Sequence, residues 1–477
     1  MYIPTRVIAM KGTGKDNKIA DVIVLGAGLA GLSAAQRLGD ASLVLEKENR
    51  PGGLVRTECF NNYWFDRVLH LLYFPDPLTK LRVQEILGTD LAQCTPLAWV
   101  ETQSGTVRYP LQMHLGGLEK SSAFSCLVDL MKAKLSHSPR LSNNFEEMLL
   151  HTFGSSMCRI FLLPYNRKLW KRPLTSLAPF DFQWTISKPN LKHVFKGIIF
   201  PDSEFDAYNY QGFYPRPPMN SSVRGMELLS HKLAGQVFDL RLNHTVTKID
   251  TKRCIVYVMN DQRMMSFRYR SNCISTIPLP ETIRMCRQTP DDILRDCDKL
   301  LRNRVLSAAF SIKGPRPVNN GHWRYYADES IIFTRLFFMH EFDPLTAPED
   351  GWGVCAEIVQ PAEVPMMEPK GILNRALNDI HRSGVLPPTC EVVDQHLIII
   401  DPGYVVFTKE NKDIITRMRD FLADHGVIPL GRYGRWEYSS MGQVMRDAYT
   451  AASRVAVTSS AFENNSSVGN ESPGIEF

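Results

Sequence analysis

The sequence predicts an α/β protein with more than one domain. Near the start of the chain, a glycine-rich turn joins a short apolar strand to an amphipathic helix, which is typical of a parallel sheet covered by helices. In the second half, short β-rich segments between turn residues predict an antiparallel sheet. The 477 residues also exceed the length that one hydrophobic core usually supports.

The first element is a βαβ unit. Residues 21–25 are predicted to form a buried strand, residues 28–38 a helix and residues 42–45 the next strand. The turn between the first strand and the helix is Gly26-Ala27-Gly28-Leu29-Ala30-Gly31, followed by Glu46 at the end of the second strand. This is the pattern of a Rossmann-like dinucleotide-binding unit.

Each position of this pattern has a physical role. Gly26 permits a tight turn, Gly28 lets the backbone approach a pyrophosphate, and Gly31 allows the helix to pack closely on the strand. The helix N-terminus adds positive potential. Glu46 is expected to accept hydrogen bonds from ribose hydroxyl groups.

A second glycine pair favours FAD over NAD. The segment Arg50-Pro51-Gly52-Gly53-Leu54-Val55-Arg56-Thr57 resembles the second motif of FAD-dependent amine oxidases and their relatives. The resemblance implies a Rossmann-like FAD-binding domain in which Arg56 contacts the pyrophosphate. It also implies that Val246, in a predicted strand at 245–249, meets the adenine.

The C-terminal region narrows the resemblance. Gly431-Arg432-Tyr433-Gly434-Arg435-Trp436-Glu437-Tyr438-Ser439-Ser440-Met441 is similar to the closing FAD-contact motif of UDP-galactopyranose mutases, especially the eukaryotic type. The resemblance implies that Arg432 lies beside the flavin, that Tyr438 binds the substrate diphosphate, and that Met441 begins a helix directed at the isoalloxazine. The cofactor-binding residues implied by these motifs are Gly26, Gly28, Leu29, Ala30, Gly31, Glu46, Lys47, Gly53, Leu54, Arg56, Val246, Arg432 and Met441.

Other segments resemble the substrate-binding parts of the same family. Tyr109-Pro110-Leu111-Gln112 and Asn166-Arg167-Lys168-Leu169-Trp170 are similar to segments at the uridine pocket, although Leu111 replaces an aromatic residue. Trp323-Arg324-Tyr325-Tyr326 is followed by Arg335 at the spacing of the diphosphate-binding residues, and Lys188 stands where the family has an arginine. The implied substrate-binding residues are Tyr109, Gln112, Asn166, Trp170, Lys188, Tyr325, Arg335, Tyr404 and Tyr438.

The segment Phe65-Asp66-Arg67-Val68-Leu69-His70 takes the place of a flexible histidine loop in the family. The resemblance puts His70 beside flavin N5, and gives His70, Arg335 and Arg432 as the catalytic set. The family has two glycines before the histidine, whereas Val68 and Leu69 do not readily adopt a positive φ. The alternative for His70 is therefore a packed, inert imidazole.

The resemblance implies a flavin-dependent isomerase. It would interconvert the pyranose and furanose forms of a nucleoside-diphosphate sugar, with N5 of reduced FAD as the nucleophile and NAD(P)H as the external reductant. An FAD-dependent oxidase or dehydrogenase of the amine oxidase or protoporphyrinogen oxidase type is the alternative. A protein that binds FAD without catalysis is a third possibility.

The composition argues against nucleic-acid-binding, metal-binding and membrane-spanning proteins. The net charge of +5 is spread along the chain without dense basic blocks, so no nucleic-acid partner is expected, although the charge suits an anionic substrate. The ten cysteines form no C-x-x-C pair, which favours reduced thiols in a cytoplasmic protein and no metal site. No membrane span is predicted. The identity of the sugar and the nucleotide and the oligomeric state stay open.

The chain is predicted to divide into four parts. They are a discontinuous FAD-binding domain at 18–80, 221–281 and 400–458, a mainly helical substrate-side region at 81–220, an antiparallel-sheet substrate region at 282–399, and a disordered tail at 460–477.

Overall fold

The computed structural model describes residues 19–135, 142–179, 188, 190–201 and 211–467. A seven-stranded sheet forms the first lobe and draws its strands from three separate parts of the chain. The order is β10-β11-β12-β1-β2-β9, with β18 paired to β12. The strands are β1 (Ile19–Leu25), β2 (Ser42–Leu45), β9 (Leu240–Arg241), β10 (Thr245–Asp250), β11 (Ile255–Asn260), β12 (Arg263–Ser275) and β18 (Val427–Pro429).

The centre of this sheet is parallel and covered on both faces. β1 lies between β12 and β2 and runs parallel to both. Val22 and Val24 of β1 belong to one hydrophobic core, and Ile23 and Leu25 to another. This alternation follows from the two-residue period of a strand, and a strand buried on both sides is apolar throughout.

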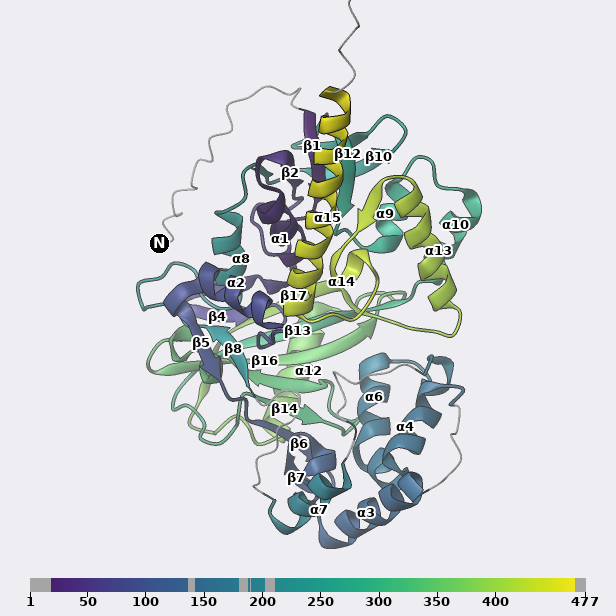
Figure 1. The fold of residues 1–477 in the computed structure, drawn as a ribbon. Helices are drawn as coiled ribbons and strands as arrows, with labels where there is room; N and C mark the ends of the chain where they lie inside the picture. Colours follow the sequence, from purple (N-terminus) through teal and green to yellow (C-terminus); the bar gives the residue numbers. More distant parts are fainter. Residues whose placement is uncertain (1–18, 136–141, 180–187, 189, 202–210, 468–477) are drawn as a thin grey trace, which may run out of the picture.

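Two groups of helices supply these cores, one on each side of the sheet (Figure 1). The first group is α1 (Leu29–Leu38), α8 (Glu227–Ala234) and α15 (Met441–Ser467). The second is α9 (Leu279–Met285), α10 (Asp291–Asp296) and α13 (Asn411–Asp424).

A second seven-stranded sheet lies below the first in Figure 1. Its order is β17-β13-β16-β15-β14-β6-β7, and all neighbours are antiparallel except β14 and β6. The strands are β6 (Ala98–Thr102), β7 (Gly105–Arg108), β13 (Arg302–Lys313), β14 (Trp323–Tyr326), β15 (Arg335–Phe338), β16 (Gly351–Pro361) and β17 (Glu391–Val405). Helix α12 (Pro369–Arg382) packs on one face through Ile372, Ala376 and Ile380.

Two features of this sheet bear on the predicted division of the chain. The hairpin of β6 and β7 comes from the region predicted to be mainly helical, and it joins the sheet because β14 offers a parallel edge to β6. The predicted boundary at residue 400 falls inside β17, which stays intact because it pairs with β13 along its length. The other boundaries remain predictions.

A helical layer covers the end of the second sheet near β6 and β7 (Figure 1). Within it, α5, one π-helical segment and α6 follow each other without a break. The helices are α3 (Lys120–Leu135), α4 (Phe145–Phe153), α5 (Ser155–Met157), the π-helix Cys158–Leu162, α6 (Leu163–Trp170) and α7 (Leu191–Ile199). Such π-helical turns occur often at functional sites.

Further elements lie outside the two large sheets. They are β3 (Thr57–Phe60), β4 (Tyr63–Asp66), α2 (Pro77–Leu87), β5 (Leu91–Cys94), β8 (Gly212–Pro215), α11 (Met339–Phe342) and α14 (Gly431–Gly434). None of the helices in the described ranges is both long enough and apolar enough to cross a membrane.

The C-terminal helix extends beyond its predicted end. α15 continues to Ser467, eight residues into the tail predicted from 460, because no glycine or proline interrupts the chain between Gly442 and Gly469. The rest of the predicted tail, residues 468–477, lies outside the described residues.

Candidate functional site

The two glycine motifs lie against each other. Gly26 has a φ of +97°, and a Cβ atom on Gly31 would lie only 1.9 Å from the carbonyl oxygen of Gly26. The amide of Gly52 donates to the carbonyl of Ala27 at 2.8 Å. Because these glycines have no side chains, the backbones of both motifs lie close together at the N-terminus of α1. The N-terminus of a helix favours the binding of an anion.

Glu46 and Arg56 flank this turn. The buried carboxylate of Glu46 accepts hydrogen bonds from the amides of Ala27 at 2.6 Å and Glu48 at 3.0 Å. Arg56 is 4% exposed, and its Nη1 lies 3.3 Å from a carboxylate oxygen of Glu48. Burial, then the charges of Arg67 and Arg50, lower the pKa of Arg56.

Arg56 has donors to spare. Within the described ranges, its buried Nε makes no hydrogen bond, and its Nη1 has only the ion pair with Glu48 at 3.3 Å. A buried donor without a partner is costly, and a guanidinium is well matched to phosphate oxygens. The turn and Arg56 therefore fit the pyrophosphate of a dinucleotide.

The remaining predicted cofactor residues lie around this turn or at its edges. Leu29 and Ala30 are buried in α1, Val246 is buried in β10, and Leu54 is partly buried in the turn after Gly53. Lys47 is exposed and pairs with Glu48 at 3.9 Å.

α15 begins with a capping box. The amide of Gln443 donates to Oγ of Ser440, and the amide of Ser440 donates to Oε1 of Gln443 at 2.8 Å. Met441 is the first residue of the helix. A Cβ atom on Gly442 would lie 2.3 Å from the carbonyl oxygen of Tyr73, so this glycine lets the segment after His70 touch the start of α15.

An aromatic cluster joins the helical layer to the second sheet. The ring centroids of Tyr109 and Tyr325 are 5.1 Å apart, and those of Trp170 and Tyr438 are 6.1 Å apart. Tyr404 lies 6.4 Å from Trp170 and 6.5 Å from Tyr438. The structure thus brings together five residues that the sequence associates with substrate binding.

A buried ion pair stands beside this cluster. Arg335 donates to Oε2 of Glu357 from Nε at 3.0 Å and from Nη2 at 2.7 Å. The hydroxyl of Tyr404 donates to Oε1 of the same carboxylate at 2.9 Å. Burial lowers the pKa of Arg335, but Glu357 and the neighbouring phenols outweigh it and raise the pKa well above its ordinary value. Arg335 is therefore charged and has its charge balanced.

Arg432 links the cluster to the first lobe. Gly431 has a φ of +75°, and a Cβ atom there would lie 2.8 Å from Cβ of Ala30, so α14 packs directly on α1. The guanidinium of Arg432 lies 4.9 Å from the ring centroid of Tyr438. In the described part of the chain, its buried Nε has no hydrogen-bond partner.

The positive charges of Arg335 and Arg432 both act on the imidazole of His70. Burial by the surrounding protein, then these two positive charges, hold the pKa of His70 well below its usual value, so the imidazole is neutral at pH 7. The side chain is nevertheless exposed, while its neighbours Leu69 and Leu71 are buried. His70 is therefore solvent-accessible and within range of two positive charges, and its catalytic role stays a prediction.

Three predicted substrate residues have other surroundings. The side chain of Asn166 donates to the carbonyl of Leu162 at 2.7 Å and accepts from Nε1 of Trp170 at 3.2 Å. Gln112 is buried. Lys188 is exposed, and its neighbours 180–187 and 189 lie outside the described residues, so its role stays a prediction.

Sequence reasoning missed two residues of the site. Glu357 is 3% exposed in a strand of apolar residues, and a charged residue in such a strand is rarely buried unless it is paired. That pattern could have identified Glu357. Tyr165 packs edge-on against Tyr325 at 5.5 Å, and burial, then Tyr325, raise its pKa. Its position one residue before Asn166 was the available signal.

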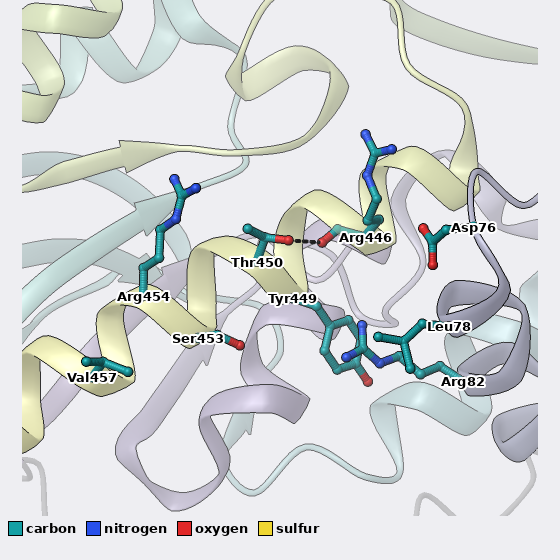
Figure 2. A pocket seen from close by; sticks show the side chains of 9 residues that line it. All are labelled: Asp76, Leu78, Arg82, Arg446, Tyr449, Thr450, Ser453, Arg454 and Val457. Atoms are coloured by element: carbon teal, nitrogen blue, oxygen red, sulfur yellow. Dashed lines mark hydrogen bonds between the residues drawn. The ribbon is translucent and has the colours of Figure 1, made fainter.

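A groove of about 750 Å³ lies apart from these residues, between α2 and α15 (Figure 2). The guanidinium carbon of Arg82 lies 3.8 Å from the ring centroid of Tyr449. The groove is lined by Asp76, Leu78, Arg82, Arg446, Tyr449, Thr450, Ser453, Arg454 and Val457, none of which was predicted as a site residue. No group of three or more histidine, cysteine or acidic side chains in the described ranges is placed to hold a metal ion.

Comparison with known proteins agrees with this geometry. Residues 24–82 match the family described as an NAD(P)-binding Rossmann-like domain. Over 92% of this chain and 94% of the other, the structure superimposes on that of reduced UDP-galactopyranose mutase with a TM-score of 0.83 and 19% sequence identity. The chain shares its fold with UDP-galactopyranose mutase.

Oxidases have related folds at lower similarity. A proposed protoporphyrinogen oxidase from Exiguobacterium sp. 255-15 has a TM-score of 0.67 at 15% identity, with 93% of this chain and 100% of that chain covered. Cyclohexylamine oxidase from Brevibacterium oxydans IH-35A has a TM-score of 0.62 at 16% identity, with coverage of 92% and 99%. These likenesses confirm the predicted α/β fold class with its Rossmann-like domain.

Proposed function

We propose that this protein is an FAD-dependent mutase that interconverts the pyranose and furanose forms of a nucleoside-diphosphate sugar. The observation that carries the proposal is the meeting of Arg335, Tyr404 and Tyr438 beside Arg432 and His70. In this structure the hydroxyl of Tyr404 donates to Glu357 and that of Tyr438 to the carbonyl of Val405 at 2.7 Å. If these hydroxyls exchange their present partners for phosphate oxygens, they and the guanidinium of Arg335 suit a diphosphate group, which must be held while its bond to the sugar breaks.

The cofactor would occupy the turn described above. A Cβ atom on Gly28 would meet nothing within 4 Å, so this glycine leaves room for the pyrophosphate, and Arg56, whose buried Nε has no partner in the described ranges, would bind it. The chemistry that FAD would supply when bound is nucleophilic, through N5 of its reduced ring. In this proposal NAD(P)H is the external reductant.

The side chains of this protein would position the reacting groups. Trp170 and Tyr109 would flank the base and ribose of the nucleotide, while Arg335 and the tyrosines keep the released diphosphate in place for its return. Arg432 would balance negative charge next to the cofactor. The neutral His70 offers one ring nitrogen as donor and the other as acceptor at pH 7.

Two observations favour an oxidase or dehydrogenase as a second candidate. Glu357 already neutralises Arg335, which reduces the attraction of the cluster for a diphosphate. In addition, Leu69 is 3% exposed and packed in the core where the mutases have a glycine, so the His70 segment has less freedom to rearrange.

The experiment reduces the purified protein with dithionite and incubates it with UDP-galactose, dTDP-galactose or dTDP-fucose. An isomer of equal mass, formed only after reduction, would support the mutase. Flavin reduction by an amine or alcohol substrate without any isomer would support the oxidase.

Three variants test the site itself. Arg335→Ala and Tyr438→Phe should keep FAD and lose activity on the sugar nucleotide. Tyr326→Phe is the matched control for a lost phenol, because Tyr326 faces the opposite core, on the side of the sheet covered by α12. Loss of flavin in Arg335→Ala or Tyr438→Phe would contradict the assigned positions.

A further inference from the structure

Lys168 is a buried lysine that faces away from the aromatic cluster. On α6, Asn166 and Trp170 are four residues apart and share one face, whereas Lys168 lies on the opposite face. The residue is 3% exposed. Its ammonium group donates three hydrogen bonds, at 2.9, 2.8 and 2.6 Å, to the carbonyl oxygens of Tyr326, Asp328 and Phe333. All three donors of the ammonium group are therefore used.

These carbonyls belong to the connection between β14 and β15. Tyr325 near the end of β14 pairs with Arg335 at the start of β15. The amide of Tyr326 donates to the carbonyl of Thr334 at 2.9 Å and closes the connection. The conformation of residues 327–334 therefore sets where Tyr325 and Arg335 lie relative to α6.

We propose that Lys168 is a positioning residue that fixes the distance between the two halves of the substrate site. It ties the helix carrying Asn166 and Trp170 to the turn that aligns Tyr325 and Arg335. The inference rests on the proposed function, because these halves are the nucleotide and diphosphate subsites only if the substrate is a sugar nucleotide. Nothing in the chemistry of the reaction requires Lys168 to touch the substrate.

Charges around Lys168 suggest how the tie responds to pH. Burial, then the charge of Lys171, lower the pKa of Lys168 to about 7, while Asp328, Asp379 and Glu329 act in the opposite direction. These carboxylates have partners of their own: Glu329 pairs with Arg167, and Asp379 pairs with Arg375 and Arg382.

A neutral amine donates two hydrogen bonds instead of three. Above pH 7, one carbonyl of the turn consequently loses its partner, and a buried carbonyl without a partner is destabilised. The hydrogen bonding between Lys168 and the turn should therefore weaken as the pH rises from 7 to 9.

The test compares Lys168→Met with Arg167→Met. Methionine keeps much of the length of lysine and removes every donor. Arg167 is the matched control, because it lies on the same helix and reaches the same turn, but only through an exposed pair with Glu329 at 4.0 Å. Hydrogen exchange at residues 326–334 reports on the tie, and the dissociation constant for UDP reports on the site. Flavin absorbance verifies that both variants fold.

Lys168→Met should speed exchange in this segment and raise the dissociation constant for UDP about tenfold, which corresponds to roughly 1.4 kcal/mol. Arg167→Met should change neither. Between pH 7 and 9, binding of UDP to the wild-type protein should weaken towards that of Lys168→Met, whose own affinity stays constant.

Unchanged exchange in Lys168→Met would overturn the tie, whatever the protein binds. Faster exchange with an unchanged affinity for UDP would overturn the positioning role. If the wild-type protein binds neither UDP nor dTDP, the proposed function is refuted and the positioning role falls with it.

Discussion

Replacement of Glu357 by glutamine isolates the charge that balances Arg335. The carboxylate is 3% exposed and accepts two hydrogen bonds from Arg335 and one from Tyr404, at 2.7 to 3.0 Å. Glutamine has nearly the same volume, so packing is kept and only the negative charge is removed. The guanidinium of Arg335 would then be a buried charge without a counter-charge.

Breaking a buried ion pair from one side costs about 3–5 kcal/mol. Glutamine retains one acceptor oxygen, so we expect the free energy of unfolding to fall by about 3 kcal/mol, at the low end of this range. The measurement is urea denaturation of the protein with its bound flavin. Glu329→Gln is the control, since Glu329 is exposed and pairs with Arg167 at 4.0 Å, and its loss should change stability by less than about 0.5 kcal/mol.

A loss below about 1 kcal/mol in Glu357→Gln would refute this reasoning, because it would mean that Arg335 does not depend on Glu357 for its charge balance. UDP supplies a further readout. If the diphosphate binds Arg335, UDP should stabilise Glu357→Gln more than the wild-type protein.

Two other predictions concern the glycine turn and the response to acid. Gly28→Ala should fold normally, because a Cβ atom there meets nothing within 4 Å, but it should bind less flavin. Gly31→Ala should fail to fold stably, because its Cβ atom would lie 1.9 Å from the carbonyl oxygen of Gly26. Equal thermal melting curves for the two variants would contradict this prediction. Burial, followed by nearby positive charge, lowers the pKa of both His322 and His340 to about 4. Between pH 6.5 and 4 the unfolded chain binds protons that the folded chain does not, so both histidines should reduce stability as the pH falls through this window, and His340→Gln should make the fall in melting temperature shallower.

Local pattern was sufficient for the elements that carry their own signal. The strand, turn and helix around Gly26 follow from the alternation of apolar residues and from the backbone freedom of glycine. The length of β17 did not follow in the same way. Its stability depends on pairing with β13, which is distant in the sequence.

The candidate site shows the same limit. Resemblance of short motifs predicted Trp170, Tyr404 and Tyr438 as neighbours, and the structure brings their rings within 6.5 Å of one another. The motifs did not predict that Glu357 would pair with Arg335, because the two residues meet only when β15 lies beside β16.

The sequence by itself determined the α/β class, the dinucleotide turn and most of the residues that could hold a ligand, because glycines and strand alternation act over a few residues. Only the tertiary structure decided the charge state and surroundings of those residues. Arg335 acquires a counter-charge, the charges of two arginines help to keep His70 neutral, and Lys168 on a helix far away in the sequence binds the turn between β14 and β15. The physical reason is that burial and electrostatic interaction depend on distances through space, which chain order does not contain.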